Sequence, residues 1–270
     1  MIRLFPQPAR FALLIAMLVC IAGPRANADT TPVRHVEGTL HGFLELRSPD
    51  GRIVASGDST TVVDGDRVTA HTIFHFKDGS LDDETTLFSQ HHDFRLISDR
   101  HIQKGPAFPH PMDVSIDAGS GQVTVHYQKD GKEQVDTSHM DLPSDLVNGM
   151  VPVVVENMRP GEASTTVAML VATPKPRVVK LVLTRLDDDS FALGGATRKA
   201  IHYQIKIELG GLAGILAPLF GKQPPDIEIW TVGGDAPVFV KEQGPLYPQG
   251  PMMTIQLASP VWGKQTSSGD

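Results

Sequence analysis

The sequence predicts a mainly β protein, built as one large curved antiparallel sheet (half-barrel or β-sandwich-like) with one or two helices. Asp-Gly turns separate runs of alternating apolar and polar residues, the runs are rich in Val, Ile, Leu and Thr, and no fixed repeat or long linker divides the chain. Asp-Gly between alternating runs favours a hairpin, because glycine supplies the positive φ of a tight turn. About a dozen strands must curl to bury their apolar face.

The first half of the chain is typical of a β-meander. Turn signals stand at residues 48–51, 64–66 and 77–80. Between residues 68 and 76 the apolar side chains of Val68, Ala70, Phe74 and Phe76 share one face of the predicted strand. Further strands are expected at 113–116, 122–128, 133–139, 165–172, 178–186, 199–209, 227–232, 238–241 and 253–257.

Residues 143–158 change period, and their apolar residues recur at three-to-four spacing behind a possible Ser144 cap. This pattern predicts a helix that covers one face of the sheet. Gly149 weakens this helix prediction, and Pro152 removes a backbone donor and would kink the helix.

The N-terminus predicts a secretory signal peptide. Arg3 and Arg10 precede an uncharged apolar run over residues 11–21, which is too short to cross a bilayer. Ala26-Asn27-Ala28 gives the small-x-small pattern that a signal peptidase accepts. We expect cleavage after residue 28, a single β-rich domain over residues 29–262, a disordered tail over 263–270, and a periplasmic or extracellular product.

An uncleaved anchor and a lipoprotein attached through Cys20 are the alternatives. The length of the apolar run disfavours the anchor. Val19 disfavours the lipoprotein, since lipid attachment needs a small residue before the cysteine. Cys20 is the only cysteine, so the mature chain has no disulfide and no thiol ligand or nucleophile.

The charge balance disfavours nucleic acid and anionic membrane surfaces as partners. The signal holds three of the 24 Lys and Arg residues and no acid, which leaves 21 basic and 31 acidic residues, a formal net charge of about −10. Nucleic-acid affinity comes from clustered Lys and Arg, and none cluster here. No stretch after the signal reaches membrane-spanning length, so we expect a soluble product.

No catalytic, cofactor or metal motif emerges from the residue pattern, and no cofactor is expected. His71 and His75 lie four apart, about 13 Å on a strand, which is too far for one metal ion. His91 and His92 are adjacent and would point to opposite faces. The run 82–84 offers paired carboxylates for acid–base work, but it follows a turn, where acids are ordinarily solvated.

Residues 210–221 form an uncharged apolar segment bounded by glycines. Such a segment is either a short helix in the core or an apolar cover over a ligand. The loop 105–111 is stiffened by three prolines and fixes Phe108, which suits binding but needs no function.

Two resemblances follow from these features. The chain resembles an uncharacterised family of exported bacterial β-rich proteins, a domain of unknown function. The sequence motifs that carry this resemblance are Phe76 to Ser80 with Asp82 to Thr85, and Gly221 to Asp226. The architecture alone resembles the half-barrels of periplasmic lipoprotein carriers. That resemblance implies a concave apolar face that holds acyl chains.

The leading hypothesis is a non-enzymatic protein that binds an apolar ligand, such as a lipid or acyl chain, within the curved sheet. An envelope protein-interaction or structural module is the alternative, and a hydrolase using His and acidic residues near 82–101 is the third. The expected ligand-binding residues are Leu212, Ile215, Leu216, Leu219, Phe220, Phe74 and Phe76.

Overall fold

The computed structural model describes residues 30–171, 175–193, 196–212, 224–235 and 237–258. The expected signal peptide, Cys20 and the tail lie outside these residues. None of the helices within them has the length and hydropathy that a membrane crossing requires.

Fifteen strands form one continuous antiparallel sheet, which confirms the mainly β fold class. The first eight strands are β1 (Leu40–Arg47), β2 (Ile53–Asp64), β3 (Arg67–Phe76), β4 (Leu81–Gln90), β5 (Phe94–Lys104), β6 (Met112–Asp117), β7 (Gln122–Lys129) and β8 (Lys132–His139). After the helix α1 (Val151–Asn157) come β9 (Ser164–Val171), β10 (Arg177–Arg185), β11 (Asp189–Leu193), β12 (Ala196–Glu208), the short 3-10 helix η1 (Gly210–Leu212), β13 (Ile227–Val232), β14 (Val238–Pro245) and β15 (Met252–Leu257).

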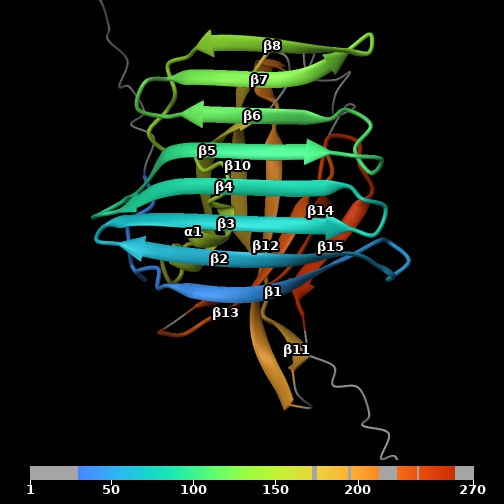
Figure 1. Ribbon diagram of the computed structural model, residues 1–270. Coiled ribbons are helices and arrows are strands. Elements are labelled where there is room, and N and C mark those ends of the chain that lie inside the picture. Colours follow the sequence, from blue (N-terminus) through green and yellow to red (C-terminus); the bar gives the residue numbers. More distant parts are fainter. Residues whose placement is uncertain (1–29, 172–174, 194–195, 213–223, 236, 259–270) are drawn as a thin grey trace, which may run out of the picture.

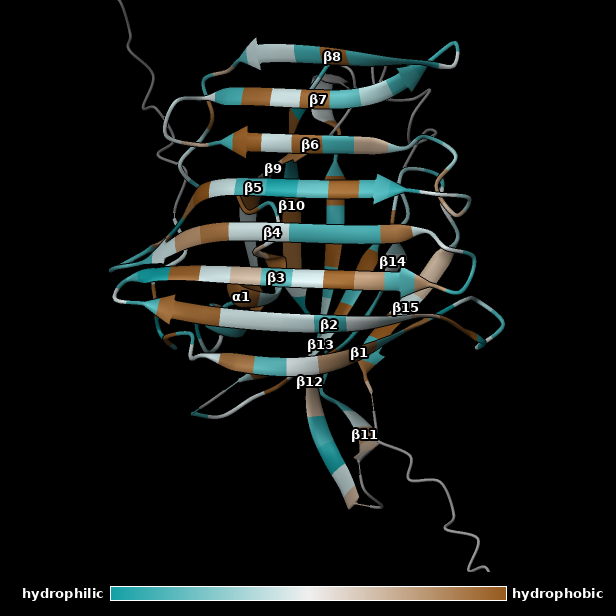
Figure 2. Cartoon of the chain, viewed as in Figure 1, coloured by the Kyte–Doolittle hydropathy of each residue, from teal (hydrophilic) through white to brown (hydrophobic). Residues whose placement is uncertain are grey.

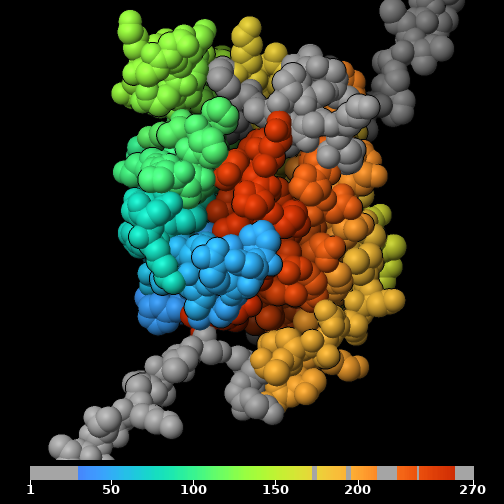
Figure 3. Space-filling view, turned by 90° about the vertical axis from the view of Figure 1, so that its right-hand side faces the viewer, coloured from blue at the N-terminus to red at the C-terminus, as the bar shows by residue number. Residues whose placement is uncertain are grey.

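The strands follow the order β8-β7-β6-β5-β4-β3-β2-β1-β15-β14-β13-β12-β10-β9, with β11 paired to β12. In Figure 1 the first eight strands form a broad wall, and β10 and β12 cross behind it. The pairing of β1 with β15 joins the two walls through the register Leu44↔Leu257 to Arg47↔Thr254. Figure 3 shows this join, where the blue N-terminal strands lie against the red C-terminal ones.

Alternation places apolar side chains on the inner face, between the two walls. Val68 and Phe74 on β3 are buried there, as the sequence predicts. Figure 2 shows the alternation as hydrophobic and hydrophilic bands along the strands. The main core lies between β3–β7 of the first wall and β9, β10, β12 and β13 of the second, and it includes α1. A second core lies beside β1–β3 and β15, and its buried members are Leu44, Leu46, Ala55, Phe74 and Met253.

The predicted helix over residues 143–158 is partly wrong, because α1 spans only Val151–Asn157. Gly149 takes a positive φ of 66°, which ends the preceding turn before the helix begins. Pro152 then falls in the first helical turn, where no backbone donor is lost. The proline therefore starts the helix and does not kink it.

Residues 145–148 close the edge of β9. The Val147 N–H donates to the Ala168 carbonyl at 2.9 Å, and the Ala168 N–H donates to the Asp145 carbonyl at 3.1 Å. The Asn148 side chain donates to the Leu170 carbonyl and accepts from its N–H. The next residue, Gly149, packs against Thr86 of β4, so this short segment links the last strand of the sheet to the first wall.

We predict that Gly149→Ala destabilises the protein by about 2–4 kcal/mol. The new Cβ would lie 1.9 Å from Thr86 Oγ1 and 3.1 Å from Asp99 Oδ1, in a left-handed backbone conformation. Gly131→Ala is the matched control, since Gly131 also has a positive φ but no heavy atom within 4 Å of the added carbon. The control should lose only about 1 kcal/mol. Urea denaturation measures both variants, and equal losses would contradict the packing argument.

Candidate functional site

Only two of the predicted ligand-binding side chains lie in the described part of the chain. Phe74 is buried in the second core, and its ring occupies the space where Gly57 lacks a side chain. Phe76 is half-buried on the same face. The side chains of Leu212, Ile215, Leu216, Leu219 and Phe220 lie outside the described residues, so their relation to Phe74 and Phe76 stays a prediction.

Phe108 is a packing residue and is not displayed for binding. It is 3% exposed and lies between two aromatic rings. Its ring centroid is 5.4 Å from that of Phe76 and 5.9 Å from that of Tyr247. The proline-rich loop therefore closes the end of the second core.

Polar side chains occupy the middle of the inner face, where a β protein of this size would be expected to place apolar ones. On β4 the inward positions are Asp82, Glu84 and Thr86, before the buried Phe88. On β5 they are Asp99, His101 and Gln103. Glu242 of β14 projects inward beside Ile255. We call Asp82, Glu84, Asp99, His101 and Glu242 the acid–histidine cluster.

His101 is the centre of this cluster. Its Nε2 atom lies 2.6 Å from Asp82 Oδ1, and its Nδ1 atom lies 4.0 Å from Glu84 Oε1. Gln103 donates to Asp82 Oδ2 at 3.1 Å and to the Leu246 carbonyl at 2.8 Å, which ties β5 to the chain after β14. Thr86 donates to Asp99 at 2.8 Å. Within the described residues, His101 is the sole basic side chain that pairs with any of these four acids.

Glu84, Asp99, His101 and Glu242 of the cluster have pKa values above those of the same groups in water. Burial raises the pKa of Glu84, and Asp82 and Glu242 raise it further against the opposing effect of His101. Burial and Glu84 raise the pKa of Asp99 to about 7. Burial alone raises the pKa of Glu242 to about 7.

Burial lowers the pKa of His101, but Glu84, Asp82 and Asp99 outweigh that effect and raise it to about 9. Glu242 raises the pKa of Glu84 although their strands are five places apart in the sheet order. The two walls therefore bring these carboxylates together across the interior.

Glu156 on α1 and Glu37, which precedes β1, form a second acidic pair. Burial raises the pKa of Glu156 on α1 to about 8, helped by Glu37 and opposed by a hydrogen bond from the Phe239 backbone. Burial also raises the pKa of Glu37. The interior thus has an excess of carboxyl groups on both the sheet and the helix.

Solvent reaches the cluster although it faces the interior. The side chains of Glu84 and His101 keep 32% and 26% of their surface exposed, whereas Asp82 keeps 10%. Neighbouring inward positions on β2 and β3 carry small residues that are also half-buried, namely Ser59, Ala70 and Thr72. Small side chains on the inner face therefore lie beside carboxylates that keep part of their surface exposed.

The geometry allows proton exchange and binding of hydrogen-bond donors more readily than other chemistry. No group of three or more His, Cys, Asp or Glu side chains in the described ranges is arranged to hold a metal ion. His71 pairs with Asp83 at 2.9 Å on the outer face, and the rings of His91 and His92 meet edge to face. Within the described part of the chain, no hydroxyl contacts His101 to act as its nucleophile.

The sequence suggested solvated acids over residues 82–84, which is wrong for Asp82, since it is 7% exposed. Asp99 and Glu242 were not singled out, and β5 was not expected. The sequence pattern that could have revealed this strand is the polar series Asp99, His101 and Gln103 at alternate positions. A register shift between Leu87 and Phe88, opposite Ser98 and Leu96, interrupts the apolar alternation before them.

Comparison with models of protein families finds no match, and no curated protein matches. Among solved structures, a crystal structure of a β-barrel-like protein of the domain of unknown function DUF1849, from Brucella abortus, is similar. The two chains are 10% identical, and the similarity covers 86% of this chain and 100% of the other with a TM-score of 0.46. This similarity says nothing about a ligand or an activity.

We predict that stability falls as pH rises from about 5 to about 8. Asp99 and Glu242 have pKa values of about 7 in the folded protein, above their ordinary 3.8 and 4.5, so the folded state binds more protons between those values. The pKa of His101, raised to about 9 from 6.5, extends the fall above neutral pH. The urea midpoint measured across this range tests the sign.

Glu242→Gln should remove about 1–3 kcal/mol of this pH-dependent change, because its carboxyl no longer titrates. Asp83→Asn is the matched control, since Asp83 lies on the outer face of β4. A stability that stays constant or rises with pH in the unsubstituted protein would contradict the raised pKa values.

Proposed function

We propose that this chain is an exported, non-enzymatic protein that binds a small ligand with an apolar body, such as a lipid or acyl chain, against the inner face of its curved sheet. The N-terminal signal pattern supports a periplasmic or extracellular location. The observation that carries the proposal is the solvent-accessible stretch of inner face beside Glu84 and His101. A fully packed sheet would leave no such surface.

The neighbouring surfaces support a ligand with two chemically different ends. Phe74 of the second core pairs in register with Asp82, and Ile255 pairs with Glu242. Apolar and acidic surfaces therefore adjoin on two separate strand pairs. An apolar body would bury surface against Ile255 and Phe239, which are only half-buried, and this stabilises a complex by about 25 cal/mol per Å².

The acid–histidine cluster supports a protonated amine as the polar end of the ligand. Three carboxyl groups lie around His101, and Glu242 acts on one of them, Glu84. A cationic donor placed beside Glu84 and Glu242 would therefore pair with carboxyl groups whose pKa values burial raises. A carboxylate head would add charge of the wrong sign. The proposed ligand is therefore a long-chain amine or a lipid with an amine head.

We expect dodecylamine to bind the purified exported protein at least about tenfold more tightly than dodecanol, and dodecanoate to bind most weakly. Displacement of a fluorescent apolar probe measures all three affinities. Glu84→Gln and Glu242→Gln should each reduce the preference for the amine. Asp83→Asn should leave it unchanged, because that carboxylate lies on the outer face.

The three twelve-carbon compounds test separately whether the protein binds an apolar body and whether it prefers an amine end. Absence of saturable binding by all of them would reject the binding function. Tightest binding of dodecanoate would reject the amine end while retaining the apolar body. Loss of binding in Leu216→Ser and Phe220→Ser would support the role of segment 210–221 as a cover, and unchanged binding would oppose it.

Acid–base catalysis is the second candidate, and the 2.6 Å contact between His101 and Asp82 favours it. A carboxylate that orients a histidine is a common arrangement for proton transfer. A screen with ester, phosphate and glycoside substrates tests it, with His101→Ala as the variant that must lose activity. A turnover that survives this substitution would exclude His101 as the catalyst.

A further inference from the structure

The two end strands of the sheet, β9 and β8, differ in whether another part of the described chain covers their free edge. The free edge of β9 is covered by residues 145–148 through backbone and side-chain hydrogen bonds. β8 pairs with β7 alone, and no backbone hydrogen bond in the described residues reaches its other edge. An open edge presents a row of donors and acceptors to any extended chain.

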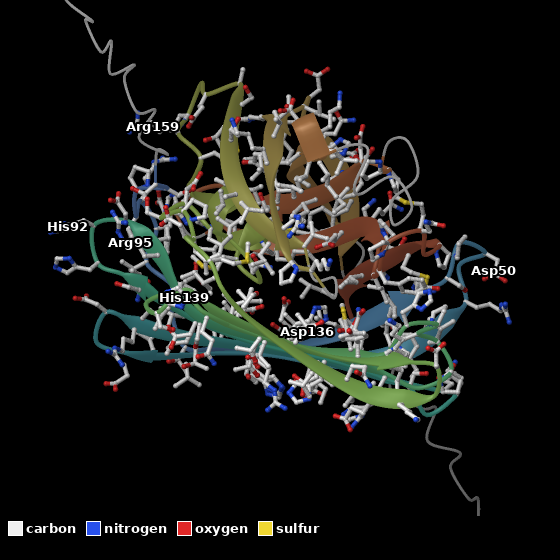
Figure 4. All side chains as sticks on the ribbon, turned by 90° about the horizontal axis from the view of Figure 1, so that it is seen from above. Asp50, His92, Arg95, Asp136, His139 and Arg159 are labelled. Carbon is white, nitrogen blue, oxygen red and sulfur yellow. The ribbon has the colours of Figure 1, made fainter. Side chains whose placement is uncertain are left out.

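Of the features that usually protect an edge strand, β8 carries charged side chains. It contains no proline or glycine, and its register with β7 runs without a bulge from Lys132↔Lys129 to His139↔Gln122. Val135 is 54% exposed on the outer face. In Figure 4, seen from above, β8 is the strand nearest the viewer, with Asp136 and His139 labelled along it.

The residues of β8 restrict which strand can pair with it. Asp136 pairs with the buried Val125, so Lys132, Gln134 and Asp136 project on the inner side of the strand. Two copies of one strand, related by a two-fold axis perpendicular to the sheet, place only residues of the same side opposite each other. The axis must therefore lie midway between the two copies of one residue, and that residue faces its own copy.

A two-fold axis at Gln134 gives complementary charges. It places Lys132 of each copy opposite Asp136 of the other, and opposite charges across a strand pair stabilise it. An axis at Glu133 would place Glu133 against itself, and an axis at Val135 would place Lys132 opposite an uncharged Ser138. Asp136 already accepts a hydrogen bond from Tyr127 at 3.0 Å, which positions its carboxylate on the inner side.

We propose that β8 pairs antiparallel with β8 of a second copy of this chain, about a two-fold axis at Gln134. The pairing extends the sheet across two molecules and leaves the acid–histidine cluster of each untouched. It is independent of the proposed ligand, so either can fail alone. A strand pair buries less surface than a standard interface, so the dimer should form with a Kd on the order of tens of micromolar.

Sedimentation velocity over about 1 µM to 500 µM measures this dimer. Lys132→Asp and Asp136→Lys should each raise its Kd at least about tenfold, because like charges then face each other. The double variant should restore the original Kd. Glu133→Lys, which reverses a charge on the outer side of the same strand, is the matched control and should change the Kd little.

Cysteine trapping tests the position of the axis, since residues 29–270 contain no cysteine. Gln134→Cys should form a disulfide-linked dimer under mild oxidation, because the two cysteines face each other. Thr137→Cys should not, because its two copies lie six residues apart along the strands, about 20 Å. Circular dichroism confirms that each variant is folded.

A protein that stays monomeric over the whole concentration range would overturn the proposal. So would a dimer whose Kd ignores both charge reversals, or one that is not restored in the double variant. Faster trapping of Thr137→Cys than of Gln134→Cys would likewise show that β8 does not pair about Gln134.

Discussion

The pairing of β1 with β15 is the constraint on which the rest of the structure depends. It is one antiparallel ladder with four register pairs, yet it joins the strands built from the two ends of the chain. Without it, β1–β8 and β9–β15 would be two separate sheets. With it, the sheet turns back on itself, and Glu242 of β14 comes to face Glu84 of β4 across the interior. The candidate site is therefore a consequence of strand order.

The fold class could be predicted because most strands follow simple rules. Along β3 the apolar residues occupy one face, and the Asp-Gly turns fall where glycines take a positive φ, as at Gly65 and Gly79. The helix was placed in the right region with the wrong start, because its apolar spacing continues through turns that precede Val151. Spacing alone does not distinguish a helix from a compact turn that buries the same side chains.

The candidate site was harder to predict because it breaks the pattern that identifies strands. β5 begins with buried Phe94 and Leu96, changes register at its middle, and then points Asp99, His101 and Gln103 inward. The alternation rule expects apolar residues on the inward side of a strand, so it does not identify residues 94–104 as a strand. Glu242 of β14 likewise occupies an inward position at which the alternation rule expects an apolar residue. Departures from local consistency are expected at functional positions, where burial of polar groups costs stability.

The acid–histidine cluster costs stability in this fold. Carboxyl groups that lose water without gaining a cationic partner favour their neutral form, which is why the pKa values of Asp99 and Glu242 rise. Apolar residues at these positions would extend the main core without that cost. The arrangement is explained if the interior must accept protons or hydrogen-bond donors from outside the chain.

The segment 145–149 has a consequence for the size of the interior. At one end it is bonded to β9, and at the other its glycine lies against β4, so it spans the separation between the two walls. The separation of the two walls at this point is therefore tied to the length of a few residues of loop. Insertion or deletion of one residue here is the shortest evolutionary route to a larger or smaller interior on an unchanged sheet.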